Sequence, residues 1–122
     1  MKYRNNMQTT QKKYLRVTTS KGERVVEKME IVCCKQFTFG TSIHLKNGDH
    51  YLMREDIPQL RMILEGDNFF VVNDKVLINL KFVDAVFPDY LLMRNGEHFN
   101  ITNQRKQDFF NRVNKYFELD YI

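Results

Sequence analysis

A chain of 122 residues, 43% of them hydrophobic, is long enough to bury one core and too apolar to be disordered throughout. Its apolar runs fall short of the roughly 20 residues that a membrane-spanning helix requires, and no apolar leader opens it, so we expect a cytoplasmic protein without a membrane partner. The net charge of +4 is unevenly placed, because residues 1–28 carry +6. Such a basic end suits attraction to phosphate, and it is equally typical of a solvated tail.

The apolar patterns predict a mainly β domain with short helices, of the α+β class. We expect residues 1–13 to form a flexible basic arm and residues 14–122 to form a single domain. In chain order, strands are expected near 14–18, 24–26, 29–34, 41–46, 50–54, 69–72, 76–80, 82–87, 90–93 and 98–101. Helices are expected at 57–64, opened by an acid and a proline, and from 102 or 103 to 117.

Two short stretches repeat the order base, Asn, Gly, acid, His, aromatic, at residues 46–51 and 94–99. Asn-Gly between apolar alternations predicts a hairpin with a two-residue type I′ turn. That turn would pair Ile43 with Leu52 on the core face and place His50 at the edge of the core. Since each hairpin leads into a predicted helix, the chain contains two copies of a strand–turn–strand–helix unit.

Residues that could support catalysis or metal binding are few and poorly spaced. The histidines are His44, His50 and His98, and none has a partner at metal-ligand spacing, so we interpret them as structural. Cys33 and Cys34 are adjacent within an apolar strand, which favours buried, inert thiols in a reducing compartment. A phosphate-binding loop and a nucleophile elbow are both lacking. We therefore expect no enzyme, no metal, no cofactor and no small-molecule substrate.

One stretch, residues 67–83, carries the strongest similarity to a known family. Its phenylalanines precede the turn Asn73-Asp74-Lys75, and Ile78-Asn79-Leu80 follows. This order resembles the LytTR (LytR/AlgR-type) DNA-binding domain of bacterial response regulators, in which a His-Arg-Ser-like turn is followed by Val-Asn-Leu. A second match begins at Thr102, where the family has a Ser-Arg-Arg-like segment before its last helix. The resemblance covers about residues 14–117.

The resemblance implies an elongated arrangement of small antiparallel sheets with two helices. It also implies a transcriptional regulator whose loops, at 35–39, 73–75 and 102–106, enter successive major grooves of double-stranded DNA. Binding of a second copy at repeated half-sites is what the family suggests. Amide side chains read adenine, whereas lysine and arginine read guanine or hold phosphate. The expected contact residues are Lys35, Gln36, Asn73, Asp74, Lys75, Asn103, Gln104, Arg105 and Lys106.

This sequence departs from the family at two of these loops. Asp74 stands where a base or amide is usual, so it must accept from a cytosine amino group or be paired by Lys75 or Lys81. Asn103 and Gln104 replace the usual cations. An alternative is therefore that the same scaffold has lost DNA reading and acts as a protein-interaction module. The chain is too short to hold a receiver domain of about 120 residues as well, so we expect it to stand alone or to be a piece of a longer protein.

Overall fold

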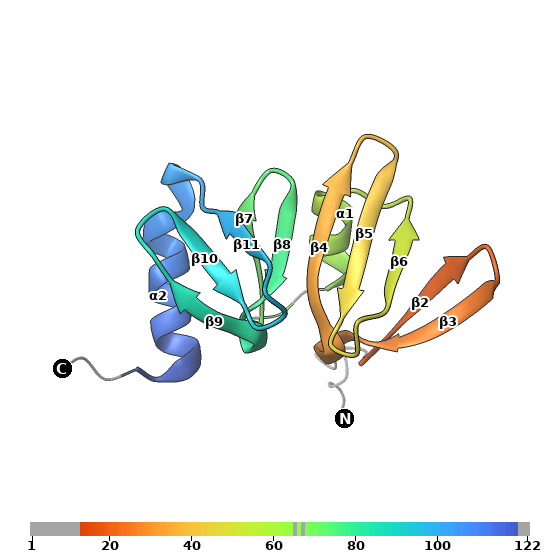
Figure 1. Cartoon of the computed structure of the whole chain (residues 1–122), viewed down its shortest axis with the longest axis horizontal. Coiled ribbons are helices and arrows are strands. Elements are labelled where there is room, and N and C mark those ends of the chain that lie inside the picture. The colour runs from red at the N-terminus through yellow and green to blue at the C-terminus, as the bar shows by residue number, and fades with distance from the viewer. Residues whose placement is uncertain (1–12, 65, 67, 120–122) are drawn as a thin grey trace, which may run out of the picture.

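The computed structural model describes residues 13–64, 66 and 68–119, and within them the chain forms antiparallel sheets and two α-helices (Figure 1). The strands are β2 (Tyr14–Thr19), β3 (Gly22–Glu27), β4 (Ile31–Phe37), β5 (Gly40–Leu45), β6 (His50–Met53), β7 (Phe69–Asn73), β8 (Val76–Asn79), β9 (Val83–Val86), β10 (Tyr90–Met93) and β11 (His98–Asn100). The helices are α1 (Ile57–Ile63) and α2 (Lys106–Phe117), with 3-10 turns η2 (Lys28–Glu30), η3 (Leu80–Phe82) and η4 (Asn103–Arg105). The predicted mainly β architecture with two helices is confirmed. Most of the predicted basic arm, residues 1–12, lies outside the described residues.

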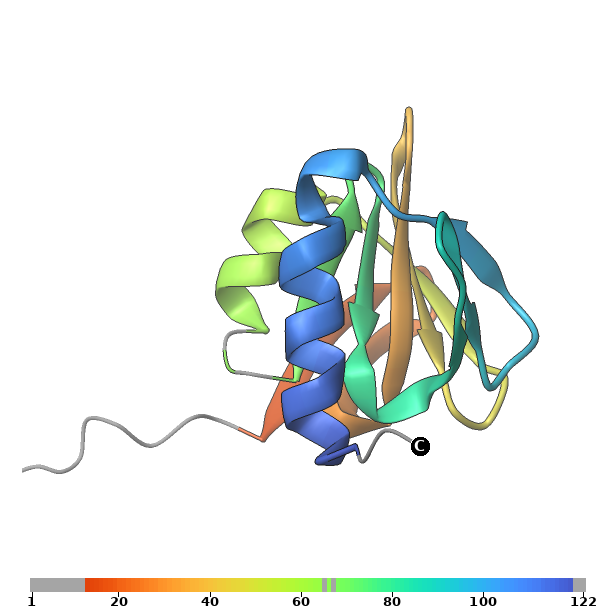
Figure 2. The ribbon, with the colours of Figure 1, turned by 90° about the vertical axis from the view of Figure 1, so that its left-hand side faces the viewer.

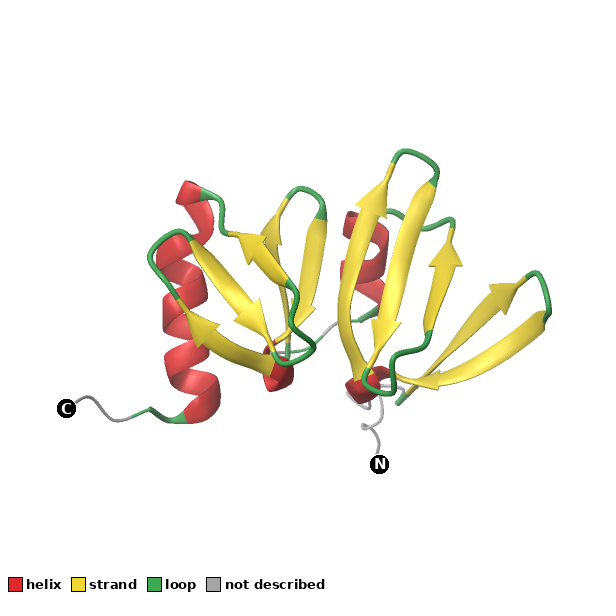
Figure 3. Ribbon diagram, in the orientation of Figure 1, coloured by secondary structure: helices red, strands yellow, loops and turns green. Residues whose placement is uncertain are grey.

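The largest sheet has five strands in the order β6-β5-β4-β8-β7 (Figure 3). Strands β11-β10-β9 form a second sheet, and β2-β3 forms a separate hairpin. Figure 2 shows the three-stranded sheet on one side of the five-stranded sheet and α1 on the other. No described helix has the length and apolar character needed to cross a membrane.

Strands β4 and β8, adjacent at the centre of the large sheet, supply both hydrophobic cores. Successive strand residues point to opposite faces. Cys33 and Ile78 pack with α2 and the three-stranded sheet, whereas Cys34 and Leu77 pack with α1 and the β2-β3 hairpin. All four side chains are fully buried. The predicted apolar, buried setting of the two cysteines is thus confirmed.

The first Asn-Gly hairpin closes with three residues, so the predicted two-residue turn is wrong. The Leu45 amide donates to the Asp49 carbonyl at 2.8 Å, and the Gly48 amide donates to the Leu45 carbonyl at 3.0 Å. Gly48 has a φ of +95°, as expected for a type I turn followed by a left-handed residue. The Asn47 side chain accepts from the Asp49 amide at 2.9 Å. The second hairpin closes in the same way around Gly96.

The extra turn residue shifts the pairing by one position and reverses which β6 side chains face the core, while Ile43 of β5 stays buried. Ile43 lies opposite Tyr51 instead of Leu52, and the Leu52 side chain is left 51% exposed. A slip of one residue moves a whole strand's side chains to the other face. His50 is exposed and stacks on His44, with ring centroids 5.6 Å apart, so its predicted place at the core edge is wrong.

Asn79, the central residue of the Ile-Asn-Leu motif, is a fully buried polar side chain. Its Nδ2 donates to the Ile31 carbonyl at 2.9 Å, and its Oδ1 accepts from the Lys81 amide at 3.0 Å. The side chain therefore joins the end of β8 to the start of β4 and caps η3, which leads into the three-stranded sheet. A buried polar group is tolerated because both its ends are satisfied.

Replacing Asn79 with alanine should destabilise the fold by about 2 kcal/mol or more, because the buried Ile31 carbonyl and the partly buried Lys81 amide lose their partner and a cavity remains. Urea unfolding followed by circular dichroism measures this change. Asn47→Ala serves as the matched control, since Asn47 caps an exposed turn and should cost less than about 1 kcal/mol. Equal midpoints for Asn79→Ala and the unmutated chain would contradict the role assigned to Asn79.

Candidate nucleic-acid interface

Three connections from distant parts of the chain lie along one edge of the domain, at the top of Figure 1. They are the β4–β5 turn, the β7–β8 turn and the β11–α2 connection. Backbone bonds tie them together: the Gln36 amide donates to the Lys75 carbonyl at 2.8 Å, and the Thr102 amide donates to the Val72 carbonyl at 3.0 Å. We call this set of connections the turn edge. It unites the three segments in which the sequence predicted contacts.

Asn73 fixes the β7–β8 turn and connects it to the next segment. Its Oδ1 accepts from the Lys75 amide at 2.9 Å, and its Nδ2 donates to the Asn100 carbonyl at 2.8 Å. Both ends of the amide are thus engaged with backbone. The Lys75 side chain, in the same turn, is different: it is exposed, and no hydrogen bond or ion pair to its ammonium group is found among the described residues.

Asp74 is paired by Arg105, and the expected pairing by Lys75 or Lys81 is wrong. The carboxylate Oδ1 lies 3.4 Å from a guanidinium nitrogen of Arg105, and the Asp74 side chain is 91% exposed. Lys81 instead faces Glu30, at 3.8 Å. Arg105 lies 31 residues further along the chain, so this ion pair links the β7–β8 turn to the β11–α2 connection.

The β11–α2 connection presents two unengaged amide side chains. Thr102 precedes the single turn η4, and α2 then begins at Lys106. Asn103 and Gln104 are exposed, and no hydrogen bond to either side chain is found in the described part of the chain. Lys106 forms an ion pair with Asp89. The connection therefore offers hydrogen-bonding amides next to cations that are already paired.

Lys35 and Gln36 lie within strand β4, so their predicted placement in a loop is corrected. The Lys35 ammonium contacts the Glu97 carboxylate at 2.6 Å, which joins the large sheet to the β10–β11 turn. The Gln36 Oε1 accepts from the Ile57 amide at 2.8 Å, at the start of α1. Both side chains are half-buried and hold neighbouring elements in place.

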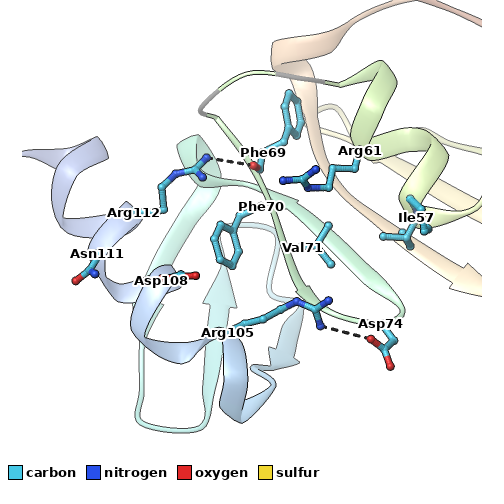
Figure 4. A pocket seen from close by; sticks show the side chains of 11 residues that line it. Ile57, Arg61, Phe69, Phe70, Val71, Asp74, Arg105, Asp108, Asn111 and Arg112 are labelled. Atoms are coloured by element: carbon cyan, nitrogen blue, oxygen red, sulfur yellow. Dashed lines mark hydrogen bonds and ion pairs between the residues drawn. The ribbon is translucent and has the colours of Figure 1, made fainter.

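A groove of about 600 Å³ runs beside β7 between α1 and α2 (Figure 4). Three arginines line it, Arg61 from α1, Arg105 from η4 and Arg112 from α2. Arg112 lies over the Phe70 ring, 5.4 Å from its centroid. Figure 4 shows the Arg105–Asp74 pair at one end, so the groove opens onto the turn edge.

The buried thiols are unsuited to nucleophilic chemistry. Burial is the main cause that raises the pKa of Cys33 to about 12, and burial also raises the pKa of Cys34 well above its usual range. Both groups stay protonated at neutral pH, where a nucleophilic cysteine would need to ionise. Burial lowers the pKa of His44, which favours its neutral form. Among the described residues, no three His, Cys, Asp or Glu side chains gather closely enough to hold a metal ion.

Comparison with solved structures finds a LytTR DNA-binding domain from Bacillus cereus with the same fold. The TM-score is 0.74 over 84% of this chain and 97% of that domain, at 17% sequence identity. No protein-family model matches the chain, and no curated protein sequence matches it. The chain therefore has the LytTR-type fold expected from residues 67–83, with small antiparallel sheets and two helices.

Proposed function

We propose that this chain is a transcriptional regulator that binds double-stranded DNA through the turn edge. The LytTR-type fold supports DNA binding in general. The observation that carries the specific proposal is the gathering of three connections at one edge, where the side chains of Lys75, Asn103 and Gln104 are exposed and have no partner among the described residues. A lysine and two amides are side chains that hold phosphate or read base edges in a major groove. No catalytic step is needed for this function.

We assign the residues of the turn edge to two groups, those that contact DNA and those that hold the turns in shape. Lys75, Asn103 and Gln104 contact DNA, and Asn73 keeps the β7–β8 turn in shape. Arg105 exchanges Asp74 for a phosphate on binding; an exposed ion pair is worth only about 0.2–1 kcal/mol, so this exchange costs little. Lys106 exchanges Asp89 in the same way. DNA contacts by Lys35 and Gln36 stay a prediction that would require breaking their bonds within the protein.

A second candidate function follows from the two ion pairs at the turn edge. Asp74 and Asp89 neutralise two of the edge's cations, which weakens attraction to phosphate and suits a protein partner. Titration of the full chain into a random-sequence duplex separates the two candidates. DNA binding requires affinity that falls steeply with salt, through counterion release. If the chain binds no duplex at low salt, the result favours the second candidate, a protein-interaction function.

Lys75→Ala should weaken binding to all duplexes alike and reduce the slope of log affinity against log salt by about 1, because one phosphate contact is lost. Fluorescence anisotropy at a series of salt concentrations measures both quantities. Lys46→Ala is the matched control, since Lys46 is an exposed lysine in the β5–β6 turn, and this turn lies at the opposite end of the sheet (Figure 1). The proposed contact is wrong if the two variants bind alike.

Asn103→Ala and Gln104→Ala should relax base preference while leaving affinity for random duplex nearly unchanged. A bidentate amide contact is worth about 1–3 kcal/mol of discrimination, or about 5- to 150-fold, at one base pair. Selection from a randomised duplex library with each variant measures the preference position by position. Asn47→Ala, in the turn at the far end of the sheet, should select the unmutated chain's sequence. Unchanged preference in both edge variants would contradict amide reading.

Asp74→Asn should tighten binding, because it removes a negative charge from the turn edge and releases Arg105 for phosphate. We expect an increase of about 3- to 10-fold at low salt and a steeper salt dependence. Asp49→Asn, a carboxylate in the turn at the opposite end, should leave the affinity unchanged. Weaker binding by Asp74→Asn would indicate instead that the carboxylate accepts from a cytosine amino group.

A further inference from the structure

The turn between β4 and β5 presents two stacked phenylalanines to solvent. Phe37 and Phe39 are 45% and 74% exposed, and their rings are nearly parallel, with centroids 5.8 Å apart. Figures 1 and 2 show that this hairpin projects beyond the neighbouring turns of the edge. We call residues 37–40 the aromatic tip. Neither ring belongs to the two hydrophobic cores of the described part of the chain.

The backbone of the aromatic tip is fixed by local geometry. Phe37 pairs with Gly40 across the turn, and Gly40 has a φ of +150°. A Cβ at Gly40 would lie 2.5 Å from the carbonyl oxygen of Met53, so the close approach of β6 requires glycine. The tip is therefore presented in a defined orientation instead of as a loose loop.

The polar residues next to the tip are already engaged. Lys35 contacts Glu97 and Gln36 caps α1, as described above. At the tip itself, Thr38 offers a hydroxyl and a methyl group, and the other exposed groups are phenyl rings. This connection therefore has little capacity to hydrogen-bond base edges, although it lies beside the β7–β8 turn through the Gln36–Lys75 backbone bond.

We propose that the aromatic tip enters the major groove and reads thymine through its 5-methyl group, with Phe39 as the main contact. This inference rests on the proposed DNA-binding function. The thymine methyl is the apolar group that a base pair displays in the major groove, and phenylalanine is one of the side chains that contacts it. A two-stranded β-ribbon fits the width of that groove. The tip thus supplies thymine preference, while Lys75 and the amides contact polar groups further along the edge.

A uracil scan tests the contact directly, because deoxyuridine differs from thymidine only by the missing methyl. A duplex is selected from a random library with the full chain, and each thymine in it is replaced in turn by deoxyuridine. We expect about fourfold weaker binding at one or two adjacent positions, which is the effect of one buried methyl group, and no change elsewhere. A selected site without thymine, or a flat scan, would overturn the proposal.

Variants assign the effect to the tip. In Phe39→Ala, replacing thymine with uracil at the sensitive positions should weaken binding by less than about 1.5-fold, because the contact with the methyl group is already lost. Met62→Ala is the matched control, since the Met62 side chain is also 74% exposed but lies on α1. It should keep the wild-type response. A fourfold response that persists in Phe39→Ala would show that another residue reads the methyl, and the proposal would be wrong.

Cross-linking gives an answer that does not depend on any variant folding. Iodine in 5-iododeoxyuridine occupies the place of the thymine methyl, and irradiation of the wild-type complex at the sensitive position should link it to residues 37–39. A link to another segment overturns the proposal. Sequence-selective binding with a flat uracil scan would leave DNA binding standing and remove only the thymine-reading role. A change of sedimentation in Phe39→Ala with an unchanged uracil response would identify the tip as a contact between copies.

Discussion

The antiparallel pairing of β4 with β8 is the constraint on which the rest of the structure depends. It joins Cys33 to Ile78, Cys34 to Leu77 and Lys35 to Val76 across more than 40 residues of chain. Alternating side chains of these two strands enter opposite cores, so the pairing fixes both cores together. It also sets the β7–β8 turn beside the β4–β5 turn. Loss of this register would separate the parts of the turn edge.

Polar contacts between residues distant in sequence complete the arrangement of sheets and turns that the β4–β8 pairing sets. The buried Asn79 side chain fixes the path from the large sheet into the three-stranded sheet. Lys35 and Glu97 then link the two sheets, and the bond from Asn73 to the Asn100 carbonyl brings the β11–α2 connection to the β7–β8 turn. These side chains position the turn edge through their contacts within the protein. Several of the exposed side chains beside them make no such contacts among the described residues.

Local patterns predicted the elements well, because each depends on neighbours in sequence. Asp56 caps α1 through the Gln59 amide at 2.9 Å, with a proline in the first turn, as the sequence indicated. The hairpin register was not predictable in this way. Asn-Gly suits both a two-residue and a three-residue turn, and the choice made at Gly48 reverses the faces of strand β6, while Ile43 of β5 stays buried.

The candidate site was predictable as a set of segments but not as a set of free side chains. The family resemblance pointed to three connections, and the fold brings these connections together at one edge. It could not show that Gln36 caps α1, or that Asp74 is paired by Arg105 from 31 residues away. Those partners are distant in sequence and are determined only by the packed structure. The stacked Phe37 and Phe39 were visible as exposed aromatics, but their position beside the edge also required the fold.

Hydrogen exchange of the full chain with and without a selected duplex tests the central claim most directly. DNA bound at the turn edge should slow amide exchange in the segments 36–40, 73–76 and 102–106, while the turns around Gly48 and Gly96 keep their rates. Slowing confined to the Asn-Gly turns or to the β2-β3 hairpin would contradict the turn edge as the DNA-binding surface.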